Sequence, residues 1–531
     1  MADQAGAMNT HHLNALSQDG FFCGIANRST VDSLAPTVAL GADMGIPVEK
    51  ADLCIVGAGL AGINALFVAS RYLTRDQRVI LVDRRERVGG MWVDTYSYVH
   101  LHQPHPMFTA GNIKWTLGKP PSYLASKSEV LGHFQHCLSE IEKRLSVDEF
   151  FGWTVESEIE KADGVAVTCR AADGSLLRIE TKQLIKAYGF RVEPNDPLPV
   201  SSSQVRSVSP DTCDVHAAPM ADSRDPVWII GGGKTAMDTA HALITDCPDR
   251  EVNLLAGGGT FFHDREKFFP DRMHRWWTGT MVSSIAEEIS HRFDGTNEDE
   301  LWTWHRDRYG LWSTPQTGNF VLGVLSKQEN DTIRSGLSRV LNDHLVDVVD
   351  TAEGPQMTLR SGASLPMAPG SWLVNCTGYI VHRSFSYEPY LSPGGRVLSI
   401  QSTSATLHLS SFMAYFSTHL FLSGKMAEVP LYELDMLELY EKARKAWTYT
   451  LMTLVGHNLG LLFDSLPSKA FRECGLDFDL WYPLPRRLLA TAKFVRNHRR
   501  ERDHLRRTLD TVHERFGVRC GPLPATDRSA A

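Results

Sequence analysis

The stretch Asp52-Leu-Cys-Ile-Val-Gly-Ala-Gly-Leu-Ala-Gly62 constrains the fold of this 531-residue chain more than any other. Residues 53–56 are an apolar run typical of a buried strand, and residues 63–72 are an apolar-rich run typical of a helix. Three glycines between the two runs supply a tight turn, a close approach of backbone to a phosphate, and close packing of helix on strand. They are Gly57, Gly59 and Gly62.

A second apolar strand, predicted at residues 78–82, ends in Asp83. In βαβ nucleotide-binding units an acid about 20 residues after the last glycine binds the ribose hydroxyls, and the helix N-terminus faces the phosphates. The motif therefore predicts a dinucleotide site. Its predicted binding residues are Gly57, Ala58, Gly59, Leu60, Ala61, Gly62 and Asp83.

The chain continues with Arg84-Arg-Glu-Arg-Val-Gly-Gly90-Met91-Trp92. Two consecutive glycines let backbone pass close to a flat ligand, and Trp92 is placed to cover such a ligand. The alternative is a β-turn beside a core tryptophan. The preceding motif favours the ligand, so Arg84, Gly90, Met91 and Trp92 join the predicted cofactor-binding residues.

These elements together resemble the FAD half of the flavin-containing monooxygenases, whose relatives are the Baeyer–Villiger monooxygenases and the microbial N-hydroxylases. The resemblance rests on Gly57-x-Gly-x-x-Gly62, on Asp83 and on the Gly-Gly-Met-Trp92 element. The disulfide reductases share the fold but place a redox cysteine pair just after the two glycines. Residues 93–106 contain no cysteine, which argues against dithiol chemistry here.

The segment 96–106 contains three histidines, His100, His102 and His105, which suggests a metal site. No set of carboxylates or cysteines accompanies them, and two prolines impose an extended, irregular path, so we predict no metal. The resemblance places this segment along the flavin ring, where the monooxygenases have an amide near the reactive carbon. Gln103 is then the catalytic candidate, with His102 behind it. For each histidine the alternative is a loop residue bound to backbone.

Between the first motif and residue 225 the pattern predicts a helix, a β-meander and a connection. The helix is expected at 128–145, the meander strands at 153–159, 165–170 and 176–180, a further strand at 183–187, and a Pro-, Ser- and Asp-rich crossover at 191–224.

The opening pattern then repeats. Residues 226–230 form an apolar strand, Gly231-Gly-Gly233-Lys234-Thr235-Ala236 supplies a second glycine-rich turn, and a second strand is expected at 251–256. A phosphate loop of the Walker type would need a glycine where the chain has Trp228. Gly231, Gly233, Lys234 and Thr235 are therefore predicted to bind a second dinucleotide.

Alternating segments at 346–349 and 356–360 predict a second meander. Asn375-Cys-Thr377-Gly378-Tyr379 resembles the A-T-G-Y linker of the monooxygenases, which returns the chain to the FAD domain, so Thr377 and Gly378 are added to the cofactor-binding residues. The predicted fold class is α/β, with two Rossmann-like domains of the glutathione-reductase type, β-meanders, a helical insertion and a C-terminal helical cap. The predicted parts are an N-terminal arm (1–48), the first part of the FAD domain (49–215), an NAD(P)H domain (216–375) with an insertion at about 260–345, the FAD-domain return and cap (376–475), and a basic C-terminal helix (476–531).

The insertion holds five of the 12 tryptophans, which either fill its own core or border a substrate pocket. The run 447–463 is predicted to be a buried amphipathic helix. Residues 484–516 are predicted to form a long basic helix, docked by a seam of Leu488, Leu489, Ala492, Val495 and Leu505. An acidic membrane surface or partner is the alternative role of this helix.

The bulk composition sets limits on function. A net charge of −8 argues against a nucleic-acid binder, and nine dispersed cysteines without C-x-x-C suggest reduced thiols and a cytoplasmic protein. We expect no signal peptide and no transmembrane segment. The sequence leaves the oligomeric state open.

The resemblance implies an FAD-dependent monooxygenase. NADPH would reduce the flavin, with NADH as the alternative, and a flavin C4a-hydroperoxide would transfer oxygen from O₂ to a small organic substrate in an N-, S- or Baeyer–Villiger-type reaction. Residues 205–211 lack the F-x-G-x-x-x-H element of those enzymes, which favours a divergent or N-hydroxylase-like member. Arg265 and Lys267 are interpreted as surface charges rather than as ligands of a 2′-phosphate. The alternatives are a flavin reductase or dehydrogenase without oxygen transfer, and a non-catalytic dinucleotide-binding sensor.

Overall fold

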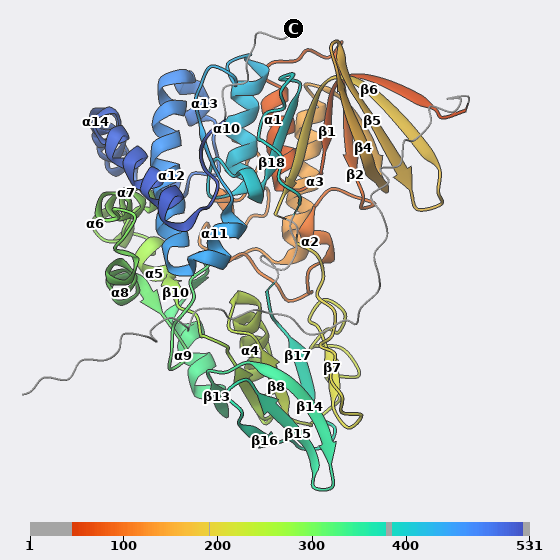
Figure 1. Ribbon diagram of the computed structural model, residues 1–531, viewed down its shortest axis with the longest axis vertical. Helices are drawn as coiled ribbons and strands as arrows, with labels where there is room; N and C mark the ends of the chain where they lie inside the picture. The colour runs from red at the N-terminus through yellow and green to blue at the C-terminus, as the bar shows by residue number, and fades with distance from the viewer. Residues whose placement is uncertain (1–44, 191, 379–384, 524–531) are drawn as a thin grey trace, which may run out of the picture. The chain divides into compact units, whose positions relative to one another are not determined.

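The computed structural model describes residues 45–190, 192–378 and 385–523 (Figure 1). A parallel sheet surrounds the first glycine motif. In it β1 (Val48–Val56) lies between β2 (Arg78–Asp83) and β6 (Leu176–Gly189), and β3 (Ser146–Phe151) pairs with the outer edge of β2. The predicted arm lies outside the described residues except at 45–48, where β1 already begins.

Helices cover this sheet. α1 (Leu60–Ala69) packs against α3 (Lys127–Glu142) and against α10 (Ser410–Leu422). Ser126 and Glu129 form a capping box at the start of α3, where the Ser126 side chain accepts the Glu129 N–H. The buried face of α3 is the predicted one and includes Val130, Phe134 and Leu138.

The first meander differs from the prediction in one respect. β4 (Trp153–Lys161) pairs antiparallel with β5 (Gly164–Ala171), and β5 pairs antiparallel with the first half of β6. The separate strands predicted at 176–180 and 183–187 are one strand, because Thr181 and Lys182 carry no turn chemistry and stay extended. One edge of β6 pairs parallel with β1 from Arg178 to Lys186, while the first half of its other edge pairs with the meander.

The second domain has a five-stranded parallel sheet in the order β13-β9-β8-β17-β7. Its strands are β7 (Arg206–Val208), β8 (Val227–Ile230), β9 (Val252–Leu255), β13 (Arg339–Leu341) and β17 (Trp372–Asn375). β7 comes from the predicted crossover, so this sheet starts before residue 216. An antiparallel sheet joins β14 (Leu345–Thr351), β15 (Gly354–Leu359) and β16 (Ser364–Pro366). α4 (Lys234–Asp246) packs against α9 (Lys327–Gly336).

The insertion is mostly helical. It comprises β10 (Phe262–Asp264), α5 (Arg265–Phe268), α6 (His274–Trp277), α7 (Val282–Arg292), α8 (Glu298–Tyr309), β11 (Gly310–Leu311) and β12 (Val324–Leu325). Its tryptophans differ in exposure. Trp302 is buried against Phe261 with ring centroids 5.1 Å apart, whereas Trp276 and Trp277 are 41% and 79% exposed.

After the second domain the chain returns to the first sheet. β18 (Val397–Gln401) pairs parallel with the second half of β6. The cap follows with α10, α11 (Met436–Lys442), α12 (Arg444–Ser465) and α13 (Ser468–Arg472), and β19 (Tyr432–Leu434) pairs with β20 (Cys520–Pro522). α12 is buried along most of its length, as predicted. These elements confirm the predicted fold class.

The C-terminal helix α14 (Leu484–Phe516) has the predicted bounds, but the predicted docking seam is wrong. Leu488, Leu489 and Val495 are 58%, 73% and 45% exposed, and Ala492 is exposed as well. Only Leu505 of the five is buried. The helix docks through another face, which includes His498, Leu509 and Val512, because periodicity alone does not distinguish two partly apolar faces. No helix among the described residues is both long enough and apolar enough to span a bilayer.

Candidate functional site

The first glycine-rich turn joins β1 to α1 and leaves no room for side chains. A Cβ atom at Gly57, where φ is +103°, would lie 2.6 Å from the Ala187 carbonyl oxygen. A Cβ at Gly62 would lie 1.7 Å from the Gly57 carbonyl oxygen. Glycine is therefore required at both positions, and the N-terminus of α1 begins at Gly59 against the sheet.

The structure brings the two predicted FAD segments together. The Gly89 N–H donates a 3.0 Å hydrogen bond to the Ala58 carbonyl oxygen. A Cβ at Gly90, where φ is +56°, would lie 2.7 Å from the Gly59 Cα. The two glycine segments, some 30 residues apart in sequence, thus form one face of bare backbone, which suits a close approach to a phosphate or a flat ring.

Asp83 is buried at the end of β2 and fixes the turn. Its Oδ2 accepts the Ala58 N–H at 2.6 Å, and its Oδ1 accepts the Arg85 N–H at 2.8 Å. The Arg84 side chain is 46% exposed and forms an ion pair with Glu193 at 3.3 Å.

The short helix α2 (Met91–Asp94) follows the two glycines. Trp92 is partly buried and meets the Phe108 ring edge-to-face, with centroids 5.6 Å apart. The Met91 side chain is exposed. Of the residues predicted after Asp83, Trp92 and Gly90 thus belong to the interior of the site region, whereas Arg84 and Met91 reach solvent.

The three histidines after α2 contact different partners. His100 Nδ1 lies 3.0 Å from the Tyr98 carbonyl oxygen, and His105 Nδ1 lies 2.9 Å from the Tyr123 carbonyl oxygen. His102 Nδ1 accepts the Val324 N–H at 3.3 Å. The three rings therefore do not converge on one point. Each imidazole instead contacts a backbone group.

Gln103 is buried, and its Oε1 has no hydrogen-bond partner among the described residues. A buried amide oxygen without a partner is unfavourable by about 1–3 kcal/mol. This atom is therefore a position where a bound ligand would satisfy the protein.

The second glycine-rich turn joins β8 to α4. A Cβ at Gly231, where φ is +124°, would lie 2.6 Å from the Cys376 carbonyl oxygen, and a Cβ at Gly232 would lie 2.6 Å from the Ala256 carbonyl oxygen. Gly233 begins α4 and has open space at its Cβ position. The N-terminus of this 13-residue helix is thus accessible to an anion.

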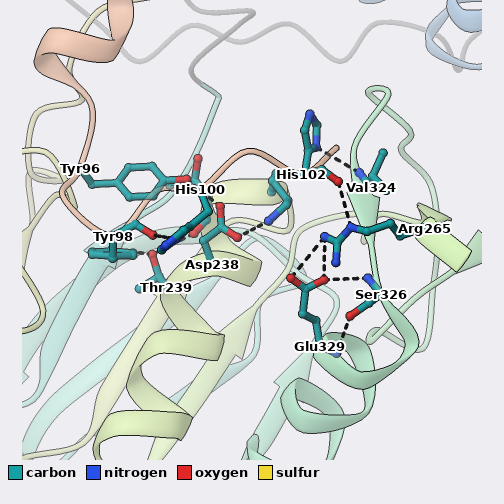
Figure 2. A network of polar contacts seen from close by, with 12 residues as sticks. Tyr96, Tyr98, His100, His102, Asp238, Thr239, Arg265, Val324, Ser326 and Glu329 are labelled. Carbon is teal, nitrogen blue, oxygen red and sulfur yellow. Dashed lines mark hydrogen bonds and ion pairs between the residues drawn. The ribbon is translucent and has the colours of Figure 1, made fainter. Parts of the chain in front are cut away.

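Two tyrosines of the first domain anchor it to α4 (Figure 2). The Tyr96 hydroxyl donates a 2.9 Å hydrogen bond to Asp238, whose other carboxylate oxygen pairs with Lys234. The Tyr98 hydroxyl lies 2.8 Å from the Thr239 hydroxyl. Burial and the Asp238 charge raise the pKa of Tyr96 well above its usual value, so it stays a donor.

A second connection runs through His102 (Figure 2). Arg265 donates from Nε to the His102 carbonyl oxygen at 2.9 Å and pairs with Glu329 at 2.9 Å. Arg265 is only 14% exposed, so its interpretation as a surface charge is wrong. Burial and the nearby cations Lys234 and Arg265 lower the pKa of His102 to about 3, and its ring is neutral. Burial opposes ionisation of Glu329, but the charges of Arg265 and Lys234 and the hydrogen bonds from Ser326 and Arg265 together lower its pKa.

A cavity of about 290 Å³ lies beside the Tyr98 contact with α4 and the Glu329 partner of Arg265. Its lining includes Tyr98, His100, Lys234, Asp238 and Glu329. Lys234, the first residue of α4, therefore lines this cavity.

The return segment lies beside the second turn. The Thr377 hydroxyl donates to Asn375 Oδ1 at 2.7 Å, and a Cβ at Gly231 would lie 3.2 Å from the Thr377 nitrogen. Gly378 has a φ of +49°. Tyr379 of the predicted linker motif lies outside the described residues.

A polar cluster between β18 and α10 was not predicted from the sequence. Its side chains are buried, and each has an oxygen with no hydrogen-bond partner among the described residues: Gln401, Ser402, Thr403, Ser404 and Thr406. A polar ligand bound at this stretch would satisfy these five groups. The sequence signal was the run Gln401-Ser-Thr-Ser404 at the end of an apolar strand, which is unusual for a core position.

Comparison with known proteins concerns the fold that carries these residues. Residues 51–284 match the model of the pyridine nucleotide-disulphide oxidoreductase family, and the match includes both glycine-rich turns. The matched part is less than half of the chain and is similar to that family. With its two Rossmann-like sheets, the chain has the fold of the flavoproteins that bind two dinucleotides, which is a fold of flavin-dependent oxidoreductases.

Individual relatives of this chain are distant. Uncharacterized proteins of Mycobacterium tuberculosis and Mycobacterium bovis are 23% identical over 358 residues, which cover 62% of this chain. The chain spans about 60% of the length of these relatives.

Solved structures are also similar. Cyclohexanone monooxygenase is 12% identical, with a TM-score of 0.49, and the match covers 80% of this chain and 99% of that one. A bacillithiol disulfide reductase from Staphylococcus aureus is 11% identical, with a TM-score of 0.44, and the match covers 72% and 99%. The two names denote different chemistries.

The described residues fit FAD and a nicotinamide dinucleotide. The bare backbone face of Gly59 and Gly90 and the unpartnered oxygens of Gln103 and of residues 401–406 fit FAD, which needs both close backbone approach and polar contacts. The open N-terminus at Gly233 fits the pyrophosphate of the nicotinamide dinucleotide.

Proposed function

We propose that the protein is an FAD-, NADPH- and O₂-dependent monooxygenase that oxygenates a small organic substrate. Bound FAD would accept hydride from NADPH and supply the oxygen-transfer chemistry. The chain's own part is to hold the two dinucleotides next to each other and to exclude water. The segment 96–103 supports this role, because it follows the first site and is anchored on the helix of the second.

The observation that carries the proposal is the Gln103 side chain. It is buried, it follows directly on His102, and its Oε1 lacks a partner. A neutral amide there offers both a donor and an acceptor to the polar edge of a flavin without titrating. We assign Gln103 as the residue that touches the cofactor.

His102 acts through Gln103 as a positioning residue. Its carbonyl oxygen and its ring nitrogen are held by Arg265 and Val324, respectively. Because the imidazole is neutral, it adds no charge next to the amide. A neutral ring at this position keeps the surroundings of the reacting atoms free of an added charge.

The thiols support oxygen chemistry over dithiol chemistry. The described cysteines are all free, and burial raises the pKa of Cys376 to about 12. Cys376 lies beside the second glycine-rich turn, where its Sγ is 3.5 Å from the Thr239 hydroxyl. A thiol with such a pKa is a poor nucleophile near neutral pH.

NADPH is favoured over NADH by the Arg444 cation and the His344 ring beyond β9, where this fold binds the adenosine ribose. A Cβ at Gly257 would lie 3.2 Å from His344 Nε2. Arg444 donates to Asn319 Oδ1 at 3.0 Å, and Asn319 donates to the Gly259 carbonyl oxygen at 2.8 Å. The neighbouring acid, Asp343, accepts the N–H of His344. We assign His344 and Arg444 to the 2′-phosphate.

The decisive test is anaerobic reduction of the FAD-loaded enzyme by NADPH, followed by mixing with O₂ in a stopped-flow spectrometer. We expect a transient absorbance at shorter wavelength than that of oxidised flavin before reoxidation is complete. Direct reoxidation with stoichiometric H₂O₂, for amine, thioether and ketone substrates alike, would contradict oxygen transfer and favour a reductase.

A further inference from the structure

Exposed apolar side chains gather on the apolar–basic surface, formed by residues 272–277 of the insertion and residues 480–500 at the start of α14. Of 13 large hydrophobic side chains exposed among the described residues, eight lie here. They are Met273, Trp276, Trp277, Leu480, Leu484, Leu488, Leu489 and Val495. Contiguous exposed apolar patches mark sites of interaction.

The two parts of this surface are fixed to each other. Arg486 donates from Nη1 to the carbonyl oxygens of Arg275 at 2.9 Å and Thr278 at 2.6 Å, and from Nη2 to that of Gly279 at 2.9 Å. Figure 1 shows α6 and α7 next to α14. The surface is therefore preformed, and the tryptophans are held beside the leucines of α14.

α14 has two apolar faces. Phe494 and His498 face α12, with His498 Nε2 3.1 Å from Asp464 Oδ1, while Leu484, Leu488 and Val495 recur on the free side at helical spacing. α14 thus has a docked face and a second apolar face that the rest of the described protein does not cover.

Arginines flank this apolar face. Arg496 and Arg500 follow on the next two turns of α14, and Arg272 precedes Met273. All three are exposed, and none forms an ion pair with another described residue. In a chain with a net charge of −8, this is a local concentration of unpaired positive charge.

We propose that the apolar–basic surface docks the protein on an anionic membrane. Adjacent tryptophans suit the depth of the headgroups, the leucines suit the acyl boundary, and guanidinium groups pair with lipid phosphates. The two features together favour a bilayer over a protein partner, which would have to match two neighbouring indoles and supply an acid for each arginine. The contact is peripheral, since it uses one face of α14.

The test is flotation of the purified, FAD-loaded full-length protein with vesicles. We expect binding to phosphatidylcholine vesicles that contain about 30% phosphatidylserine, weak binding to phosphatidylcholine alone, and loss of binding at high salt. Trp276→Ser with Trp277→Ser, and separately R496E with R500E, should each weaken partitioning at least about tenfold.

Ile159 and Val346 provide matched controls, because they are 61% and 62% exposed on strands of the two meanders. Ile159→Gln and Val346→Gln should leave vesicle binding unchanged, and all variants should keep their FAD content. Equal binding of the tryptophan variant and wild type would overturn the proposal. So would a dimer in light scattering that the same variant converts to a monomer, since the surface would then bind a second copy of the chain.

Discussion

The Tyr96 hydroxyl lies 2.9 Å from Asp238 Oδ2, and this hydrogen bond joins the segment after the first dinucleotide motif to the helix of the second. The same carboxylate pairs with Lys234 at the start of α4. A change at Tyr96 therefore affects both the contact between the domains and the cation that stands closest to the expected pyrophosphate.

Tyr96→Phe should slow flavin reduction by NADPH while FAD remains bound. The lost bond leaves a partly buried carboxylate without one of its donors, at a cost of about 1–3 kcal/mol. We expect a roughly tenfold or greater fall in the apparent affinity for NADPH, measured by stopped-flow reduction. Tyr98→Phe is the matched control, because Tyr98 contacts the neutral Thr239. Equal effects of the two variants would mean that the Asp238 charge is not involved.

Gly90→Ala should abolish FAD retention. The new Cβ would lie 2.7 Å from the Gly59 Cα, and backbone cannot move aside as a flexible side chain can. Gly59→Ala should act in the same direction, since its Cβ would lie 3.3 Å from the Gly90 Cα. The ratio of flavin to protein absorbance after gel filtration measures the effect.

Gly118→Ala separates this clash from backbone strain. Gly118 has a φ of +67°, close to that of Gly90, but open space at its Cβ position. The Gly118 variant should therefore be destabilised by about 1 kcal/mol and keep its FAD. Unchanged flavin content in Gly90→Ala would show that the phosphate-binding turn is elsewhere.

Gln103→Leu should retain FAD and become reduced by NADPH, yet lose coupling between NADPH oxidation and product. Leucine has a similar volume but removes the amide whose Oε1 is unpartnered. We expect product per NADPH to fall at least about tenfold and H₂O₂ to rise correspondingly. Gln103→Asn keeps the amide on a shorter stem and should recover part of the coupling. A fully coupled Leu variant would remove Gln103 from the site.

Acid should destabilise the protein partly through His102. The folded-state pKa of His102 is about 3 because the ring is buried near cations, whereas an unfolded histidine titrates near 6.5. Above 6.5 both states are neutral at this residue. As pH falls below 6.5, His102 binds a proton in the unfolded state but not in the folded state. The free energy of unfolding therefore drops by up to about 1.4 kcal/mol per pH unit.

His102→Asn removes this proton and keeps an acceptor for the Val324 N–H. The loss of unfolding free energy between about pH 7.5 and about pH 5, measured by urea titration, should therefore be smaller in the variant by up to about 1.4 kcal/mol per unit. His100→Asn at the exposed neighbouring histidine should behave as wild type. A pH dependence that is the same in His102→Asn and in wild type would place the His102 ring in water.

Arg444→Ala should raise KM for NADPH about tenfold or more and leave KM for NADH nearly unchanged, because a charge-assisted bond to a 2′-phosphate contributes about 1.5–3 kcal/mol. Lys445→Ala tests specificity, since Lys445 is the next cation along the chain and is paired with Asp299 at 2.5 Å. If both cofactors lose affinity equally, Arg444 supports the fold rather than the phosphate.

The parts that the sequence predicts well depend on local chemistry. The turns at Gly57 and Gly231 follow from steric limits that act within a few residues, and the apolar spacing that predicts α3 lies within one helix. The bounds of α14 follow from an uninterrupted helical composition between Pro483 and Gly517. Each of these signals is complete within one short stretch.

The features that the sequence did not predict depend on contacts with residues that are distant in the chain. Arg265 resembled a surface charge because Glu329 and the His102 carbonyl are distant in sequence. The buried oxygens of residues 401–406 became visible only when β18 was placed beside β6. On α14 the two partly apolar faces are equivalent by periodicity, and only α12 decides which one is covered.

The pairing of β18 with β6 has a consequence for synthesis on the ribosome. The second half of β6 forms by residue 189, but β18, its parallel neighbour on the edge away from β1, begins only at Val397, after the whole second domain. During translation the first domain therefore carries an unfinished sheet edge while some 200 further residues emerge, a state prone to mispairing. Release of a nascent chain truncated before Val397 should yield aggregates. In the complete chain the sheet of the first domain is finished only after the second domain has been synthesised.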